Sequence, residues 1–211
     1  YKRQVLMCYR NFFEYSDNKK NKNWKQLTPS NKEDFIITVL GYGTISKLIV
    51  KKLIYMGFNV QVWSKTKRAP KNIVYYYSDN GFHNSLKNTS CLISLLPATS
   101  STHNIVGLTE FNLLSKNCHF INVGRGSTVN EADLIYALKN KILAGAILDV
   151  FYKEPLNKDN PLWELDNVYI TPHIAGITNA TSYAAKLLRN NFDLLHSNKE
   201  LINKVSNTEG Y

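Results

Sequence analysis

From residue 35 onward, short apolar runs alternate with segments of helical periodicity. Continuous apolar runs bounded by turn residues predict buried strands, whereas apolar residues three and four positions apart predict helices that cover a sheet. The expected strands are 35–40, 59–63, 73–76, 91–95, 119–122, 144–149 and 168–170. The expected helices are 45–55, 131–138 and 180–195. This alternation predicts an α/β fold, a doubly wound parallel sheet of the Rossmann type.

The segment before the first strand predicts one amphipathic helix, at 5–15. Its apolar residues include Val5, Tyr9 and Phe12, at helical spacing, so this face needs a partner surface. A polar stretch and Pro29 then separate the helix from the sheet. We expect three parts: a linking helix and loop at 1–30, a Rossmann domain at 31–178, and a C-terminal helix and tail at 179–211.

The net charge of +10 raises the alternative of a nucleic-acid or membrane-surface partner. The basic residues are dispersed, however, and in loops such as 18–23 lysine alternates with asparagine without the aromatic residues of a base-stacking groove. No apolar run is long enough to span a bilayer. We therefore expect a cytoplasmic protein with neither a nucleic-acid nor a membrane partner.

Cysteine usage argues against a disulfide framework or a metal site. Cys8, Cys91 and Cys118 are odd in number, widely spaced and set in apolar surroundings. We expect them to be buried thiols, and we expect no bound metal.

A glycine-rich turn follows the first strand and opens the first helix of the α/β region. Gly41 would permit the tight turn, and Gly43 would let the main chain approach a pyrophosphate at the helix N-terminus. The third position of the pattern is Ser46, a small residue that still allows helix–strand packing. The alternative for the glycine pair alone is a simple turn.

The end of the second strand is where such folds read the cofactor ribose. NAD-selective sites carry an acidic residue there, whereas this chain offers Ser64, Lys65, Lys67 and Arg68. This composition favours NADP(H) over NAD(H). The alternative is a solvated basic loop.

Three residues near the ends of later strands form a candidate catalytic group. Arg125 suits a keto acid's carboxylate and carbonyl oxygen, and His173, oriented by the carboxylate of Glu154, suits proton donation to that oxygen. Each residue alone has a structural alternative: a surface cation, a structural imidazole and a loop carboxylate. The other histidines are interpreted as structural: His83, His103, His119 and His196.

Taken together, these motifs resemble the D-isomer-specific 2-hydroxyacid dehydrogenases, most closely the bacterial glyoxylate/hydroxypyruvate reductase A branch. The resemblance rests on GYGTIS, WSKTKR, LLPATSSTHNIVG, NVGRGSTVNEADL, GAILDVFYKEPL, PLW and TPHIAGIT, which run through most of the chain. It implies an NADP-dependent oxidoreductase that reduces glyoxylate to glycolate and hydroxypyruvate to D-glycerate. The preferred 2-keto acid stays open.

The resemblance also assigns roles to residues. Arg125 would bind substrate, His173 would be the acid/base group and Glu154 its orienting carboxylate. The cofactor-binding residues it implies are Gly41, Gly43, Thr44, Ile45, Ser64, Lys65, Arg68, Leu96, Pro97, Thr102, Val123, Gly124, Asp149 and Ala175.

Members of this family carry a substrate lobe ahead of the helix at 5–15, and we expect this chain to be truncated there. The helices at 5–15 and 180–195 would join the cofactor domain to that lobe. The first would also lie at a homodimer interface, and its exposed apolar face would promote self-association. The alternative function is a truncated, inactive remnant that binds NADP(H) or forms dimers.

Overall fold

The computed structural model describes residues 2–28, 30–68, 70, 72–176 and 180–204. The chain forms two compact units, Tyr1–Pro172 and His173–Tyr211, and each is described on its own. The domain boundary expected at 178/179 falls outside the described residues. Pro29 and the tail residues after 204 fall outside them as well.

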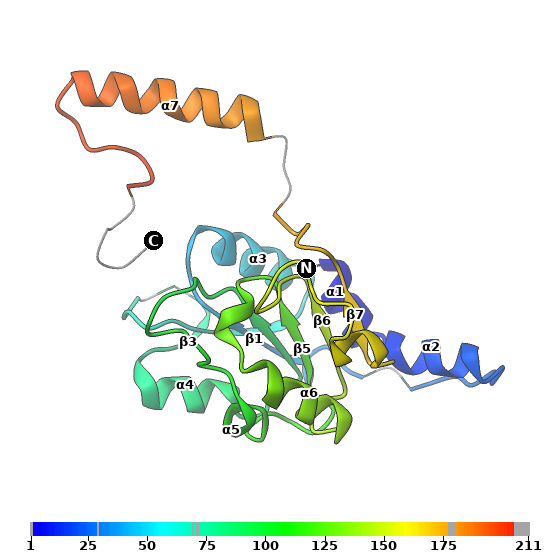
Figure 1. Cartoon of the computed structure of the whole chain (residues 1–211). Coiled ribbons are helices and arrows are strands. Elements are labelled where there is room, and N and C mark those ends of the chain that lie inside the picture. The colour runs from blue at the N-terminus through cyan, green and yellow to red at the C-terminus, as the bar shows by residue number, and fades with distance from the viewer. Residues whose placement is uncertain (1, 29, 69, 71, 177–179, 205–211) are drawn as a thin grey trace. The chain divides into compact units, whose positions relative to one another are not determined.

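The first unit is built on a seven-stranded sheet in the order β3-β2-β1-β4-β5-β6-β7, with every strand pairing parallel (Figure 1). The predicted doubly wound parallel sheet is confirmed. The strands are β1 Ile36–Leu40, β2 Asn59–Trp63, β3 Val74–Tyr76, β4 Cys91–Ser94, β5 His119–Asn122, β6 Gly145–Leu148 and β7 Val168–Ile170. Because β1 pairs with β2 on one side and β4 on the other, the strand order reverses beside β1. In open α/β sheets ligands bind at the strand ends beside such a reversal.

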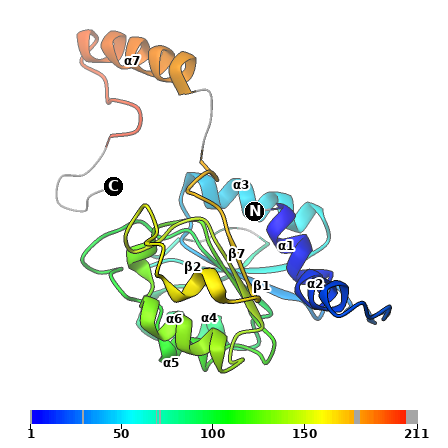
Figure 2. The same cartoon turned by 45° about the vertical axis from the view of Figure 1, so that its right-hand side comes forward.

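Helices cover both faces of this sheet (Figure 2). One face carries α1 Lys2–Tyr9, α2 Phe12–Lys20 and α3 Thr44–Tyr55, and the other carries α4 Ser78–Leu86, α5 Leu108–Phe111 and α6 Glu131–Lys139. Successive strand residues feed the two layers alternately, so Ile93 packs under the α1–α3 face and Leu92 under the α4–α6 face. Two hydrophobic cores therefore flank one sheet.

The single helix expected at 5–15 is wrong: this segment forms two helices, α1 and α2. Asn11 separates them in the left-handed conformation, with φ 54°. Asparagine tolerates this conformation better than most residues, so it can break a helix without a glycine. Much of the apolar face expected to be exposed is covered, because Val5 and Phe13 are buried with the sheet. Phe12 remains 51% exposed.

The apolar pattern did not indicate α4 or α5. In α4 the apolar spacing is sparse, since only Phe82, Leu86 and Ser85 are buried in a helix that also contains Gly81. One-turn 3-10 helices at Gly126–Thr128 and Pro161–Glu164 were not expected either.

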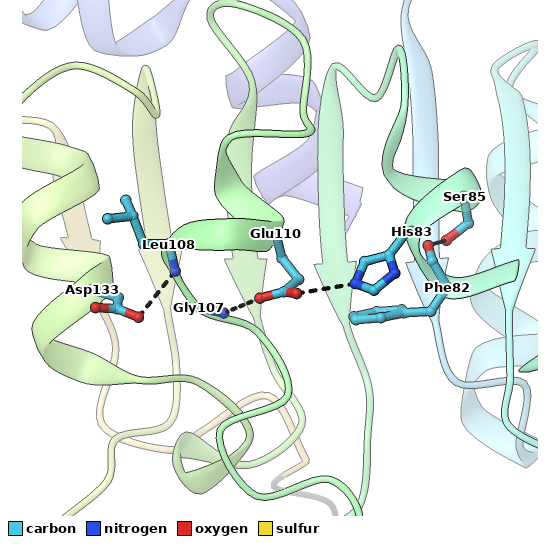
Figure 3. A network of polar contacts seen from close by, with 7 residues as sticks. All are labelled: Phe82, His83, Ser85, Gly107, Leu108, Glu110 and Asp133. Carbon is cyan, nitrogen blue, oxygen red and sulfur yellow. Dashed lines mark hydrogen bonds and ion pairs between the residues drawn. The ribbon is translucent and has the colours of Figure 1, made fainter. Parts of the chain in front are cut away.

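Polar contacts tie the helices of the α4–α6 face together (Figure 3). Glu110 accepts a hydrogen bond from the Gly107 amide at 2.9 Å and pairs with His83 Nε2 at 3.3 Å. Asp133 of α6 accepts from the Leu108 amide at 3.0 Å. The start of the short helix α5 is thus held by carboxylates from itself and from α6.

All three cysteines are buried free thiols, as predicted. Burial raises the pKa of the Cys8 and Cys118 thiols well above the usual value. Since the thiolate is the reactive form, these two side chains act as small core residues.

The second unit contains the helix α7, Ala180–His196, close to the predicted 180–195. Asn191 exchanges two hydrogen bonds with the main chain of Ile202, which fixes the segment after the helix. Within the part of the chain that the structure describes, no helix combines the length and apolar character needed to cross a bilayer.

Candidate dinucleotide and substrate site

The turn between β1 and α3 requires glycine at its first position. Gly41 has φ 95°, its amide donates to the Trp63 carbonyl at 2.8 Å, and a Cβ atom there would lie 3.1 Å from the Leu95 carbonyl oxygen. Only glycine combines this φ with so close an approach of a neighbouring strand. The turn is therefore held against the ends of β2 and β4.

Gly43 has the opposite surroundings, because a Cβ atom there would meet no heavy atom within 4 Å. It caps α3, and Thr44 and Ile45 in the first turn of that helix are exposed. Helix N-termini bind anions through unpaired amides and the helix dipole. Ser46, by contrast, is 3% exposed and packs inward, as a small third residue of the motif should.

The segments after β4 and β5 touch each other through Gly124, where a Cβ atom would lie 2.8 Å from the Leu96 carbonyl oxygen. Leu96 is buried and Pro97 is partly buried. Thr102 donates to the Pro97 carbonyl at 2.6 Å and accepts from the Thr99 amide at 2.9 Å. Its hydroxyl thus shapes the turn that follows β4.

The basic segment after β2 divides into a buried serine and exposed cations. The Ser64 hydroxyl lies 3.0 Å from the Thr66 carbonyl oxygen and 2.6 Å from the Tyr75 hydroxyl. Lys65, Lys67 and Arg68 are exposed. The cations are accessible to an anion, while Ser64 takes part in the internal structure of the loop.

Arg125 follows β5 on a firmly held main chain. Its carbonyl accepts hydrogen bonds from Thr128 Oγ1 at 2.7 Å and Asn122 Nδ2 at 3.2 Å, and its Nη1 donates to the Gly124 carbonyl at 2.8 Å. The side chain is exposed and Val123 beside it is partly buried. Asn122, which also accepts from the Gly124 amide at 3.2 Å, holds this main chain on both sides of Gly124, and we did not predict that contact.

Glu154 lies in the loop after β6, and that loop packs against the Arg125 segment. Its Oε1 accepts from the Phe151 amide at 2.9 Å. A Cβ atom on Gly126 would lie 1.9 Å from the Phe151 carbonyl carbon, so the two main chains are in direct contact. Asp149, 2% exposed, accepts from Thr171 Oγ1 at 2.5 Å. The sequence pattern gave no sign of this loop-to-loop contact.

His173 and Ala175 belong to the second unit, and both are exposed. His173 has φ 52°. A left-handed conformation costs a non-glycine residue about 1 kcal/mol or more, and such residues concentrate at functional sites. The meeting of His173 with Arg125 and Glu154 stays a prediction.

The family model that matches this chain is described as D-isomer specific 2-hydroxyacid dehydrogenase, NAD binding domain, and it covers residues 3–175. Among curated proteins, the chain is 36% identical over 174 residues to glyoxylate/hydroxypyruvate reductase A of Photorhabdus laumondii, covering 82% of this chain and 56% of the relative. It is 34% identical over 211 residues to the same enzyme of Escherichia fergusonii, covering 99% and 66%. The chain thus spans less than two thirds of the length of these relatives.

Solved structures give the same result. An NADPH-dependent glyoxylate/hydroxypyruvate reductase from Sinorhizobium meliloti, in complex with NADP and sulfate, has a TM-score of 0.93 and 32% identity, covering 100% of this chain and 67% of that one. A D-isomer specific 2-hydroxyacid dehydrogenase from Xanthobacter autotrophicus, in complex with NADPH and MES, has a TM-score of 0.93 and 30% identity, covering 98% and 85%. Because the family model matches residues 3–175 of this chain, the chain belongs to the D-isomer specific 2-hydroxyacid dehydrogenase family and contains the family's NAD-binding domain.

Proposed function

We propose that the chain is the cofactor-binding part of an NADPH-dependent reductase of small 2-keto acids, such as glyoxylate and hydroxypyruvate. One observation carries this proposal: an open, glycine-lined helix N-terminus follows β1, and an exposed basic loop follows the neighbouring strand β2. Relatives of the same fold were solved with NADP or NADPH, which supports the choice of cofactor.

The residues of this chain would share the chemistry as follows. When bound, the reduced nicotinamide supplies a hydride to the keto carbon. Arg125 would bind the substrate carboxylate and polarise the carbonyl, because its fixed fork of donors matches paired oxygens. His173 would give one proton to the carbonyl oxygen, and Glu154 would stabilise the cationic imidazole before transfer. The 2-keto acid thereby becomes a 2-hydroxy acid.

The cofactor would lie along the ends of β1, β2 and β4. We propose that Gly41, Gly43, Thr44 and Ile45 surround the pyrophosphate, with Ser64, Lys65 and Arg68 at the 2′-phosphate. Leu96, Pro97, Thr102, Val123, Gly124, Asp149 and Ala175 would line the rest of the crevice. Open sheets of this kind bind dinucleotides at these strand ends, which supports the assignment.

Assembly and location are further parts of the proposal. We propose a homodimer located in the cytoplasm. The dimer is supported by exposed apolar side chains of α1, α2 and α3, where Leu6 is 40%, Phe12 51% and Leu48 58% exposed. Singly exposed apolar residues are common on monomers, so the exposed fractions support the dimer only if these side chains are covered in it. Sedimentation of the complete gene product tests the dimer.

The experiment on function replaces His173 with Gln in the complete gene product. We expect the rate of NADPH-dependent glyoxylate reduction to fall about 100-fold or more, because general acid catalysis contributes factors of this size. The dissociation constant of NADPH should change less than about twofold, because the imidazole acts on substrate. His83→Gln, on α4, is the matched control and should keep full turnover. Undiminished turnover in His173→Gln would refute the assignment, and NADPH binding without any turnover in the wild type would favour a nucleotide-binding protein.

A further inference from the structure

Three polar atoms meet where the basic loop leaves the sheet. The Tyr75 hydroxyl, from the edge strand β3, lies 2.5 Å from the Thr66 carbonyl oxygen and 2.6 Å from Ser64 Oγ. Ser64 Oγ in turn lies 3.0 Å from the Thr66 carbonyl oxygen. The loop is also joined to β3 by its main chain, because the Ser64 amide donates to the Tyr76 carbonyl at 3.2 Å. The Tyr75 side chain of β3 thus holds the loop that follows β2.

Counting hydrogens shows which group does the holding. The two hydroxyls have one hydrogen each, and the Thr66 carbonyl has none to give. The shortest of the three contacts joins the Tyr75 hydroxyl to the Thr66 carbonyl oxygen, so we assign Tyr75 as the donor to that oxygen. With the Thr66 carbonyl satisfied by Tyr75, the Ser64 hydrogen is available to the tyrosine oxygen or to an incoming anion. Without the Tyr75 hydroxyl, the Thr66 carbonyl would depend on Ser64 alone.

The ring of Tyr75 also reaches the glycine turn. Its centroid lies 6.1 Å from that of Tyr42, which stands between Gly41 and Gly43, and Lys47 Nζ lies 5.7 Å from the Tyr42 ring. Aromatic rings at this separation attract one another, and this attraction adds to the free energy gained by burying their surface. One side chain therefore contacts both the loop that carries Lys65, Lys67 and Arg68 and the turn proposed for the pyrophosphate.

We propose that Tyr75 is a positioning residue that sets the preference for the 2′-phosphorylated cofactor by ordering the loop of residues 64–68. This inference rests on the proposed function. Ordering long cationic side chains and their loop costs free energy on binding, and a loop held in place beforehand lowers that cost. NADPH gains from this ordering through its 2′-phosphate. NADH has no 2′-phosphate to gain from it.

The test is Tyr75→Phe, which keeps the ring beside Tyr42 and removes only the hydroxyl. We expect the dissociation constant of NADPH to rise about fivefold, the size expected for one or two lost hydrogen bonds. That of NADH should change less than about twofold. Both are measured by nucleotide fluorescence titration of the 211-residue chain. Tyr76→Phe, the same change one residue along β3, is the matched control and should leave both constants as in the wild type.

Retained NADH binding shows that each variant is folded. Equal losses for NADPH and NADH in Tyr75→Phe, or no loss for either, would overturn the inference, while NADPH binding by the wild type would leave the proposed cofactor site standing. A wild-type chain that binds neither nucleotide would overturn both.

Discussion

At the scale of single residues, the glycines of this chain divide into those that the fold needs and those that a ligand would need. Gly126→Ala would place a Cβ atom 1.9 Å from the Phe151 carbonyl carbon, so we expect a loss of about 3 kcal/mol in the free energy of unfolding.

In Gly43→Ala the added methyl group enters open space, and the main chain there has an ordinary φ of −84°. The free energy of unfolding of this variant should stay within about 0.5 kcal/mol of the wild type. Its NADPH dissociation constant should nevertheless rise about tenfold or more, because the methyl would occupy the pyrophosphate's approach. Urea unfolding and NADPH titration of both variants check this, and equal effects on stability would contradict it.

His119 is a buried histidine whose lowered pKa makes the free energy of unfolding depend on pH. It is 7% exposed, its Nδ1 has no hydrogen-bond partner among the described residues, and its ring centroid lies 5.1 Å from that of Phe13. Burial lowers its pKa from 6.5 to about 4, so the folded protein favours the neutral ring. Above pH 6.5 the ring is neutral in both the folded and the unfolded protein, and the free energy of unfolding is highest there. As the pH falls from 6.5 towards 4, only the unfolded protein takes up the proton, so the free energy of unfolding falls by about 3 kcal/mol in all.

We therefore expect His119→Phe to unfold with a weaker pH dependence than the wild type. Urea unfolding at pH 7.5 and 4.5 measures this, and the wild type should lose about 2 kcal/mol more than the variant between these values. Identical losses in the two proteins would show that His119 is not the titrating group.

Local patterns predicted the glycine turn, because it stands directly after an apolar run. The candidate catalytic residues were chosen from the segments that follow later strands, and their roles stay a prediction. Tyr75 was missed for a physical reason. Its partners Ser64 and Tyr42 are distant in sequence, and only the parallel pairing of β1, β2 and β3 brings them together. Asn122 could have been found from the sequence, because it is a polar residue that ends an apolar strand just before Gly124.

At the scale of helices and strands, the network of Figure 3 makes a testable contribution. The Glu110 side chain is 14% exposed and joins the Gly107 amide to His83. Glu110→Ala removes both contacts and should cost about 1–2 kcal/mol of unfolding free energy, as for other lost helix caps. Glu110→Gln keeps an oxygen for the Gly107 amide and should cost less than about 1 kcal/mol. Thr109→Ala, an exposed neighbour, is the control, and equal costs for Ala and Gln at position 110 would contradict this account of the cap.

The central strands β4, β5 and β6 could be predicted because each is a continuous buried run, and a strand buried on both faces needs no alternation. The outer strands β3 and β7 are only partly buried and were predicted from their short apolar runs. The helices were predicted less well. Asn11 breaks the first helical segment through its own main-chain conformation, which apolar spacing does not reveal. In α4, Gly81 and a polar majority hide a helix that tertiary packing of Phe82 and Leu86 stabilises.

At the scale of the whole molecule, the fold and family are established by agreement between the predicted parallel sheet, the matched family model and the solved relatives. The joining of His173 to Arg125 and Glu154 could not be derived in the same way. It depends on how His173–Tyr211 meets the first unit, and the apolar pattern within either unit carries no information on that.

We expect the ends of β1 and β2 to bind NADPH in preference to NADH. Parallel calorimetric titrations of the wild-type chain with the two nucleotides test it most directly. We expect one NADPH per chain, bound at least about tenfold more tightly than NADH, because the 2′-phosphate gains charge-assisted hydrogen bonds from the basic loop. Equal affinities, tighter binding of NADH, or no binding of either nucleotide would contradict the claim.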